Sequence, residues 1–467
     1  MAPDDLQYFI ALLDQHNQLA RINVPVDPLL EIAAITDRVC KETGGGPALL
    51  FSHPTGSSIP VATNLFGSLR RTCTALGIEQ PGLLTERLGR LLAAIPQPDL
   101  TCLDRQIAGL PEFAACAPLT ATPPAWDRIQ VRPDLLGLPF LQGWPGDGAA
   151  AGAPRYITLP QVFTVAPDCS RPNCGMYRCQ VRGPQELAIR WGDRSGAGRH
   201  LEAWRDSGRP MPVAIALGGP PATLFSALFP LPGELDEMAF AGFLRGEPIA
   251  LAPCRTVPLQ VPASAEVVIE GFVDPAGTVR EGPFGNHTGY YAPAGSAPLM
   301  RVSAISRRHG AIIPATVVGP PPMEDCWMAK AWERLLLAFL QRLIPGIVDI
   351  HIPLEWTFHQ SAVISLDQPD PAMVREIARR LWDCPWFKDA RLTVFTDAGT
   401  TAAAAPDLLW RGINLAGSAD DLFRDDSGAR LALDATGGSG FRQPLLPDET
   451  IVRHIDRRWP EYGIPSQ

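Results

Sequence analysis

The chain has 467 residues, of which 46% are hydrophobic and 19% are charged, and its formal net charge is -9. This length suits two or three domains of a globular protein with a sizeable core. The acidic balance argues against nucleic acid or an anionic membrane as the main partner. No apolar run is long enough to span a bilayer, and the N-terminus is acidic where a signal peptide is basic. We therefore expect a cytoplasmic protein. Its ten scattered cysteines favour reduced thiols over a disulfide framework.

The first part of the chain predicts a small α/β domain. Patterns typical of helices cover residues 4–18, 27–40 and 83–95, and strand patterns cover 22–26, 48–51 and 60–63. Residues 96–126 are rich in Pro, Ala and Thr, and we expect a connection that runs over the surface. Helices and strands that alternate in this way are typical of α/β domains.

From about Ile129 the pattern changes to closely spaced strands, predicted at 155–165, 175–181, 213–217, 267–273 and 299–305. We expect only two helices among them, at 200–205 and 235–244. This pattern favours an antiparallel sheet or a partly open barrel. Asp274-Pro-Ala-Gly277 predicts a hairpin turn, after which a short strand delivers Arg280 and Glu281.

After Pro320 the α/β pattern returns, with helices predicted at 324–343 and 372–381 and strands at 347–352, 362–366 and 391–395. The resulting domains are 1–126, 127–308 and 309–467. The sequence contains no Walker phosphate loop, no Gly-x-Gly-x-x-Gly after a strand and no His-Glu-x-x-His helix.

Two polar stretches carry groups suited to chemistry. The first, Glu281-Gly-Pro-Phe-Gly-Asn-His-Thr-Gly-Tyr-Tyr291, combines a carboxylate, an amide, an imidazole and two phenols with glycines that favour tight turns. The second, Arg171-Pro-Asn-Cys-Gly-Met-Tyr-Arg-Cys-Gln180, places Arg178 in an otherwise apolar strand, where an arginine needs an anionic partner. Glu281 is the obvious partner. A substrate-orienting pair and a structural salt bridge are equally compatible with these residues.

These two stretches resemble the signature sequences of the UbiD family of reversible decarboxylases, which use prenylated FMN. The resemblance extends along nearly the whole chain, through the segments 21–28, 63–67, 262–271, 321–325 and 433–436. It implies an N-terminal α/β domain, a central split β-barrel-like domain that binds the flavin, and a C-terminal α/β domain used in oligomerisation.

The resemblance also implies ligands and partners. The cofactors would be prenylated FMN, a divalent cation such as Mn²⁺, and K⁺. A flavin prenyltransferase would supply the cofactor, and the chain would form a homodimer or homohexamer. The substrate would be an aromatic, heteroaromatic or α,β-unsaturated carboxylic acid, which releases CO2.

Residue by residue, the resemblance assigns Asn173 and Glu237 to the metal, and both are oxygen donors that suit a hard cation. It assigns Arg178, Glu281, Asn286 and His287 to catalysis. The cofactor-contacting positions are Asn173, Met176, Tyr177, Arg178, Arg190, Trp191, Gly192, Ser195, Gly196, Pro230, Glu237 and Arg430.

Three departures from the family pattern involve four positions. Asn286 replaces the usual catalytic acid, and an amide cannot deliver a proton as a carboxylic acid does. Arg194 replaces a histidine that often binds the metal. The acidic run near Asp397 is reduced, and Leu415 replaces a usual arginine.

Because position 286 is an amide, the proton would come from Glu281, from His287 or from water they hold. An alternative is that His287 is a neutral ring packed under Tyr290.

The departures leave a second function open, that of a non-catalytic paralogue that acts as a scaffold subunit. A flavin-binding protein without decarboxylase activity is a weaker third alternative.

Overall fold

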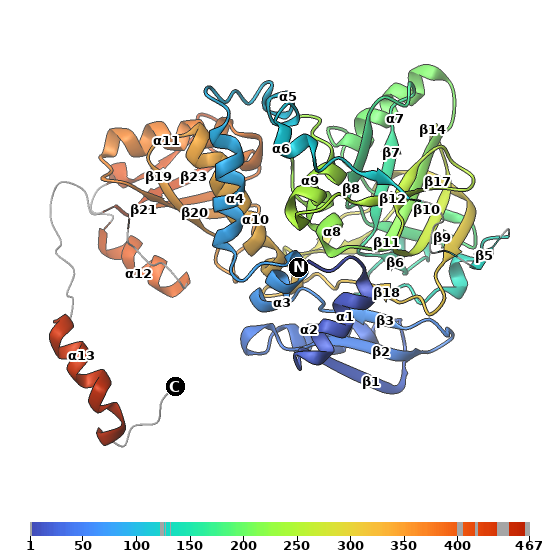
Figure 1. The fold of residues 1–467 in the computed structure, drawn as a ribbon, viewed down its shortest axis with the longest axis horizontal. Coiled ribbons are helices and arrows are strands. Elements are labelled where there is room, and N and C mark those ends of the chain that lie inside the picture. The colour runs from blue at the N-terminus through green and yellow to red at the C-terminus, as the bar shows by residue number, and fades with distance from the viewer. Residues whose placement is uncertain are drawn as a thin grey trace.

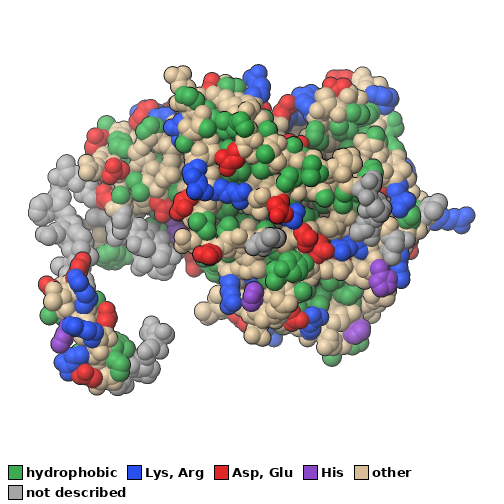
Figure 2. Space-filling view, in the orientation of Figure 1, with side chains coloured by type: hydrophobic (Ala, Val, Ile, Leu, Met, Phe, Trp, Pro, Cys, Tyr) green, Lys and Arg blue, Asp and Glu red, His purple; other side chains and the backbone are tan. Residues whose placement is uncertain are grey.

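The computed structural model describes residues 2–121, 126, 128–130, 132–398, 405–415, 419–436 and 448–462. The chain builds a small N-terminal sheet, a large central sheet and a C-terminal sheet (Figure 1). Acidic and basic side chains are intermixed on the face shown in Figure 2. Among the described helices, none has both the length and the apolar composition needed to cross a bilayer.

The N-terminal sheet has the strand order β1-β2-β3-β18 and confirms the predicted α/β unit. Its last strand comes from much later in the chain and pairs in parallel with β3. The helix α1 buries Leu6, Phe9, Ile10 and Leu13, as the spacing predicts, and Asp5 caps it. The elements of this part are α1 Leu6–Gln15, β1 Leu19–Val26, α2 Glu31–Cys40, β2 Ala48–Pro54, β3 Val61–Thr63, α3 Leu69–Leu76, α4 Gly82–Ala93 and β18 Ile313–Pro314.

The segment predicted as a surface connection contains two short helices, α5 Leu103–Ala108 and α6 Pro111–Ala114. Leu103, Ile107 and Phe113 from these helices are buried in the largest hydrophobic core of the protein. The prediction that this segment runs over the surface is confirmed, because most of residues 96–121 are exposed or half-buried, but the two helices that it contains were missed. Its few apolar residues are spaced so that one side of each short helix packs inward.

The central sheet is antiparallel, with the order β6-β9-β10-β17-β14-β11-β7-β8 and β5 added beside β17. Its edge strands β6 and β8 do not pair with each other, so the sheet does not close into a barrel. The strands are β5 Arg128–Gln130, β6 Tyr156–Ile157, β7 Gln161–Val165, β8 Pro172–Gly175, β9 Cys179–Gly183, β10 Glu186–Ile189, β11 Met211–Gly218, β14 Ala265–Glu281 and β17 Gly295–Arg307. Two smaller sheets comprise β4 Leu119–Thr120, β12 Ala250–Pro253 and β13 Gln260–Pro262, and β15 Phe284–Gly285 and β16 Tyr291–Ala292.

Three helices accompany this sheet where two were predicted: α7 Gly196–Ser207, α8 Pro221–Leu228 and α9 Glu237–Arg245. The missed helix α8 is short and buried over most of its length, so it has no polar face to mark a helical period. It packs against α9, and both lie on the side of the sheet that faces the C-terminal part (Figure 1).

Two local predictions in the sheet are wrong. Residues 274–277 do not make a hairpin turn, because β14 pairs with the same strand, β17, on both sides of them. The register shift between Val273 and Thr278 makes this segment an irregularity within one long strand. The strand predicted at 175–181 is interrupted at 176–178, so Arg178 lies in a connection between β8 and β9 and not within a strand.

The C-terminal sheet has the order β19-β20-β21-β23-β22 and confirms the predicted return to α/β structure. Its elements are α10 Glu324–Leu343, β19 Ile347–His351, β20 Ser361–Leu366, α11 Pro371–Asp383, β21 Leu392–Asp397, α12 Ala405–Leu415, β22 Leu422–Arg424, β23 Leu431–Asp434 and α13 Glu449–Arg458.

The long helix α10 is where the three parts of the chain meet. It packs along α4 from the N-terminal part, and the Thr85 hydroxyl donates to the Arg334 carbonyl oxygen over 2.7 Å. From the central part, Phe229 stacks on Phe339 of α10 with ring centroids 6.0 Å apart. The cavities described below lie around this junction.

Candidate active site

Arg178 and Glu281 form a two-pronged ion pair. The guanidinium donates from Nε to Oε1 over 2.8 Å and from Nη2 to Oε2 over 2.9 Å. The Glu281 side chain is fully buried, whereas 19% of the Arg178 side chain remains exposed. These bonds leave Nη1 as the guanidinium nitrogen that Glu281 does not engage. The predicted partnership is confirmed, and its geometry fixes the plane of the guanidinium.

The loop that follows Glu281 is fixed by hydrogen bonds and ring packing that were not predicted from the sequence. Asp147 is buried and accepts hydrogen bonds from the backbone N–H of Gly285 and of Trp144, each over 2.8 Å. Burial raises the pKa of Asp147 above its usual value, which the hydrogen bonds partly oppose. The ring of Phe284 packs on Tyr156 and under the Arg178 guanidinium, with the guanidinium carbon 4.8 Å from the ring centre.

An apolar cavity of about 220 Å³ opens beside this ion pair. Its polar wall groups include Arg178, His287 and Asp325. The remaining wall is mostly hydrophobic, with Leu159, Met176, Phe225, Leu228, Phe284, Val318, Met328, Ala329, Trp332, Leu335 and Phe358. A charged donor in an apolar cavity is the usual arrangement for orienting a small organic acid.

A larger, polar cavity of about 760 Å³ adjoins the apolar one, because Met176 and Leu228 belong to the walls of both. It brings together eight of the residues predicted to contact a cofactor: Asn173, Met176, Tyr177, Gly192, Ser195, Gly196, Pro230 and Glu237. Its wall also includes Asp193, Arg194, Arg199, Lys388 and Asp389. Together the two cavities form a space with a polar end and an apolar end.

The two predicted metal ligands lie together on the wall of the polar cavity. Glu237 is the first residue of α9, and its Oε2 accepts from the Cys174 N–H over 3.0 Å. Burial raises the pKa of Glu237 to about 8. It has no salt-bridge partner within the described part of the chain, so a bound cation would stabilise its charged form.

Asn173 is fixed next to it. Its amide nitrogen donates to the Thr164 hydroxyl over 3.3 Å. Its Oδ1 lies against Gly196, and a Cβ added at position 196 would come within 1.6 Å of that oxygen. Position 196 must therefore be glycine for Asn173 to keep this place. A carboxylate and an amide oxygen are ligands that suit a hard divalent cation. No cluster of three or more His, Cys, Asp or Glu side chains supplements them in the described ranges.

Comparison with known proteins identifies the family. Models of the 3-octaprenyl-4-hydroxybenzoate carboxy-lyase N-terminal, Rift-related and C-terminal domains match residues 10–91, 120–321 and 326–442. The chain belongs to the UbiD family. An uncharacterized protein of Aquifex aeolicus is 37% identical over 98% of this chain and 94% of its own length. One of Archaeoglobus fulgidus is also 37% identical, over 88% of this chain and 84% of its own length.

Solved UbiD-class structures share the fold. An evolved dimeric form of HmfF from Pelotomaculum thermopropionicum, in complex with prFMN, is 25% identical, with a TM-score of 0.82 over 97% of this chain and all of that chain. The closed form of vanillic acid decarboxylase from Sedimentibacter hydroxybenzoicus is 21% identical, with a TM-score of 0.82 over the full length of both chains. These likenesses bear out the three-part fold expected of the UbiD family.

Three residues assigned to the cofactor by family position lie outside the walls of both cavities, as far as the structure describes them. Arg190 donates to the Ser296 carbonyl oxygen over 2.6 Å. Arg430 pairs with Asp425 over 2.8 Å in the C-terminal sheet. Trp191 is buried beside Tyr177, and its indole N–H lacks a hydrogen-bond partner among the described residues. Their contact with a cofactor stays a prediction.

Asn286 also lies outside the described cavity walls. Its Oδ1 accepts from both the backbone N–H of Thr288, over 2.9 Å, and the Thr288 hydroxyl, over 2.5 Å. The side chain therefore stabilises the turn that follows it.

His287 does line the apolar cavity, but it does not pack as one alternative expected. Tyr290 is 79% exposed, and the imidazole of His287 instead packs on Phe358 and hydrogen bonds to His359. Burial, together with His359, lowers the pKa of His287 to about 4. At neutral pH this ring is uncharged, so one of its nitrogens donates a hydrogen bond and the other accepts one.

Asp325, the second residue of α10, is a wall group of the apolar cavity that was not predicted from the sequence. Its Oδ1 accepts from the Cys326 N–H over 3.0 Å, and Oδ2 has no hydrogen-bond partner among the described residues. Burial raises the pKa of Asp325 to about 7. The segment 321–325 was noted only for its family resemblance. An acidic pair at the start of a helix is otherwise typical of an exposed N-terminus.

Proposed function

We propose that this protein is a prenylated-FMN-dependent, non-oxidative, reversible decarboxylase of an aromatic, heteroaromatic or α,β-unsaturated carboxylic acid. The observation that carries the proposal is the Arg178–Glu281 pair at the wall of an apolar cavity that adjoins a large polar one. The family membership and the resemblance to solved UbiD-class enzymes support the same reaction.

The donor set fits the cofactor that the family implies. Asn173 and Glu237 would hold a divalent cation such as Mn²⁺, and with Arg199 and Lys388 on the same wall they would hold the flavin phosphate. The segment 227–230, which also lines the polar cavity, would lie near K⁺ and the flavin edge. When bound, prenylated FMN supplies the electron sink that the carbon losing CO2 requires.

The chain itself orients the acid and excludes water. Arg178 binds the substrate carboxylate with the donor that Glu281 leaves unengaged, and Glu281 keeps the guanidinium in place. The hydrophobic wall keeps bulk water from the reacting carbon. Both oxygens of Glu281 are occupied by Arg178, so we favour His287 as the group that returns a proton to this carbon.

The decisive experiment is co-expression with a flavin prenyltransferase, followed by absorbance spectroscopy of the purified protein and an acid panel assayed for CO2. The proposal expects a bound modified flavin and CO2 release from at least one acid. Assembly into a homodimer or homohexamer would be read in the same preparation by light scattering.

The scaffold alternative is favoured by one observation, the engagement of Asn286 by Thr288 where the family has an acid. A folded protein that takes up no flavin under these conditions would support that alternative. A protein that binds flavin but releases no CO2 would support the non-decarboxylating flavoprotein.

A further inference from the structure

Two histidines from separate parts of the chain meet at the apolar cavity. His287 follows β15 in the central part, and His359 lies between β19 and β20 in the C-terminal part. Their Nε2 atoms are 3.1 Å apart, and the rings cross at 73° with centroids 4.3 Å apart. Seventy-two positions separate them in the sequence. Both rings also pack on Phe358.

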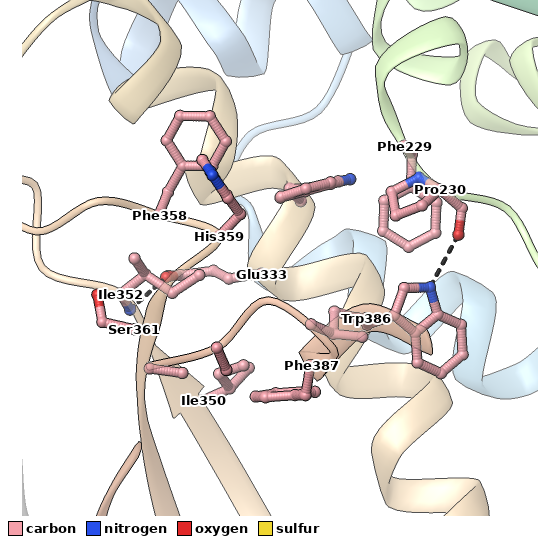
Figure 3. Close-up of a pocket in the computed structure, with 14 residues that line it drawn as sticks. Phe229, Pro230, Glu333, Ile350, Ile352, Phe358, His359, Ser361, Trp386 and Phe387 are labelled. Carbon is pink, nitrogen blue, oxygen red and sulfur yellow. Dashed lines mark hydrogen bonds between the residues drawn. The ribbon is translucent and has the colours of Figure 1, made fainter. Parts of the chain in front are cut away.

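The pair lies at the boundary between cavities. His359 lines a small cavity of about 30 Å³, where Figure 3 shows it beside Phe358. Trp332 and Phe358 belong to the walls of both this small cavity and the apolar cavity. Phe229 and Pro230 likewise belong to both the small cavity and the polar cavity. The histidine pair therefore lies between the apolar cavity and a second space that borders the polar one.

The hydrogen bond between the two Nε2 atoms limits how protons are arranged in the pair. Two neutral imidazoles whose Nε2 atoms form a hydrogen bond share one proton, so one ring donates and the other accepts. If His287 accepts at Nε2, its own proton is on Nδ1. No described residue is hydrogen bonded to that Nδ1, which leaves it for a ligand in the cavity.

We propose that His359 is a positioning residue that resupplies a proton to His287 during turnover. This inference rests on the proposed function. The bond between the substrate carbon and its carboxylate breaks, CO2 leaves, and the electron pair stays on the carbon. A proton from Nδ1 of His287 forms the new C–H bond. The Nε2 proton of His359 moves to Nε2 of His287, and water gives a proton to Nδ1 of His359 and leaves as hydroxide. A second transfer in the reverse direction, in which Nδ1 of His287 takes a proton from water and Nδ1 of His359 returns one to water, restores the starting tautomers of both rings. The balance is one carboxylate and one water giving one product with a new C–H bond, CO2 and hydroxide.

The surroundings of the pair suit this transfer. The groups whose charges act on His359 are Asp389, which favours its protonated form, and Arg391, which opposes it. Asp389 also belongs to the wall of the polar cavity. Burial, with a smaller contribution from His359, lowers the pKa of His287, and burial also lowers the pKa of His359, which favours the neutral form of both rings.

The test compares the flavin-loaded variants His359→Gln and His351→Gln. Glutamine keeps a hydrogen bond to His287 but cannot relay a proton. His351 is the matched control, because it is a half-buried histidine of the neighbouring strand β19 whose pKa burial also lowers, and it lines neither the apolar nor the small cavity. We expect His359→Gln to lower kcat and solvent-deuterium incorporation by about 10²-fold with KM little changed, and His351→Gln to leave both near wild type.

Chemical rescue separates a relay from a structural role. Added imidazole should restore part of the activity of His359→Ala and none of any activity lost in His351→Ala. Equal deuterium incorporation by wild type and His359→Gln, or a loss in His359→Ala that imidazole does not restore, would overturn the proposal.

A spectroscopic readout keeps this test separate from the proposed function. In ¹⁵N-histidine-labelled wild type, NMR should show one of the two Nε2 atoms protonated and the other not, whether or not any acid is decarboxylated. If this pattern is present and no acid releases CO2, the pair exists and the proposed function fails. If both Nε2 atoms carry protons, the relay is wrong even in an active enzyme.

Discussion

The guanidinium of Arg178 and the carboxylate of Glu281 face each other in a parallel, two-bond arrangement at 2.8 and 2.9 Å. The two residues are 103 positions apart, and they lie just before β9 and at the end of β14, two strands that β10 and β17 separate in the order of the sheet. The ring of Phe284 packs on the guanidinium, and both residues belong to the wall of the apolar cavity. The pair is thus positioned to orient an acid while remaining neutral overall.

The first prediction concerns the stability that this pair contributes. Glu281→Gln leaves the partly buried guanidinium without its counter-ion, and we expect the free energy of unfolding to fall by about 3 kcal/mol. Glu186→Gln is the matched control, because Glu186 pairs with Arg301 over 2.9 Å on the exposed face of the same sheet. For Glu186→Gln we expect the free energy of unfolding to fall by less than about 1 kcal/mol. Urea unfolding of both variants measures the difference, and equal losses would contradict this account.

The second prediction concerns recognition of the carboxylate. Arg178→Lys keeps the positive charge but loses the planar fork that engages Glu281 and a substrate together. We expect kcat/KM to fall by about 100-fold, since a single ammonium cannot reproduce both sets of hydrogen bonds. Arg182→Lys, in the adjoining strand, should have little effect because, among the described residues, the Arg182 side chain donates only to the Arg280 carbonyl oxygen. Steady-state kinetics with an acid that the wild-type protein decarboxylates measures kcat/KM for both variants. Similar kcat/KM values for the two variants would argue against Arg178 as the residue that binds the carboxylate.

The third prediction concerns the metal. Glu237→Gln removes the buried carboxylate of the donor set, so we expect metal content to fall by about 10-fold or more, with the bound flavin lost in parallel. The control is Glu234→Gln, three residues earlier, which pairs with Arg171 in an exposed salt bridge over 2.7 Å. Elemental analysis and the flavin absorbance of the purified variants measure both quantities. Full metal occupancy in Glu237→Gln would exclude this residue as a ligand.

The fourth prediction concerns pH and Asp325. Burial raises its pKa from 3.8 to about 7 in the folded protein, so the folded chain keeps this proton where the unfolded chain has lost it. Wild-type stability should therefore fall as the pH rises from about 4 to 7, and this contribution should stay constant above that range. Asp325→Asn removes this pH-dependent loss of stability. Between pH 5 and pH 8 the free energy of unfolding of the variant should therefore rise by about 2 kcal/mol relative to that of wild type.

Unfolding titrations at the two pH values measure this change, with Asp206→Asn as a control at an exposed position of α7. A constant difference between wild type and Asp325→Asn would show that Asp325 ionises alike in both states.

Much of the architecture was accessible from the sequence because its signals are local. The apolar spacing of α1 and α10 and the alternation of the central strands set which faces are buried. The Arg178–Glu281 pair was also accessible, since an arginine in apolar surroundings requires an anion.

Other features depend on pairings that one sequence does not reveal. Asp274-Pro-Ala-Gly277 has the composition of a turn, yet pairing with β17 on both sides makes it an irregularity in a strand. Arg430 matched a family position, but Asp425, five residues before it, already accepts its hydrogen bonds. His359 lies in a segment without a motif, and only the packing of the C-terminal part against the central part brings it to His287.

The most direct test of the central claim is exchange of ¹³CO2 into the carboxylate of candidate acids by flavin-loaded protein, measured for wild type and Arg178→Leu. This exchange requires the carboxylate to leave and return, and it does not depend on the proton donor. The account predicts ¹³C incorporation into at least one acid by wild type and at least 100-fold less by the variant. Wild-type protein that carries the flavin yet incorporates no label, or equal incorporation by both proteins, would contradict it.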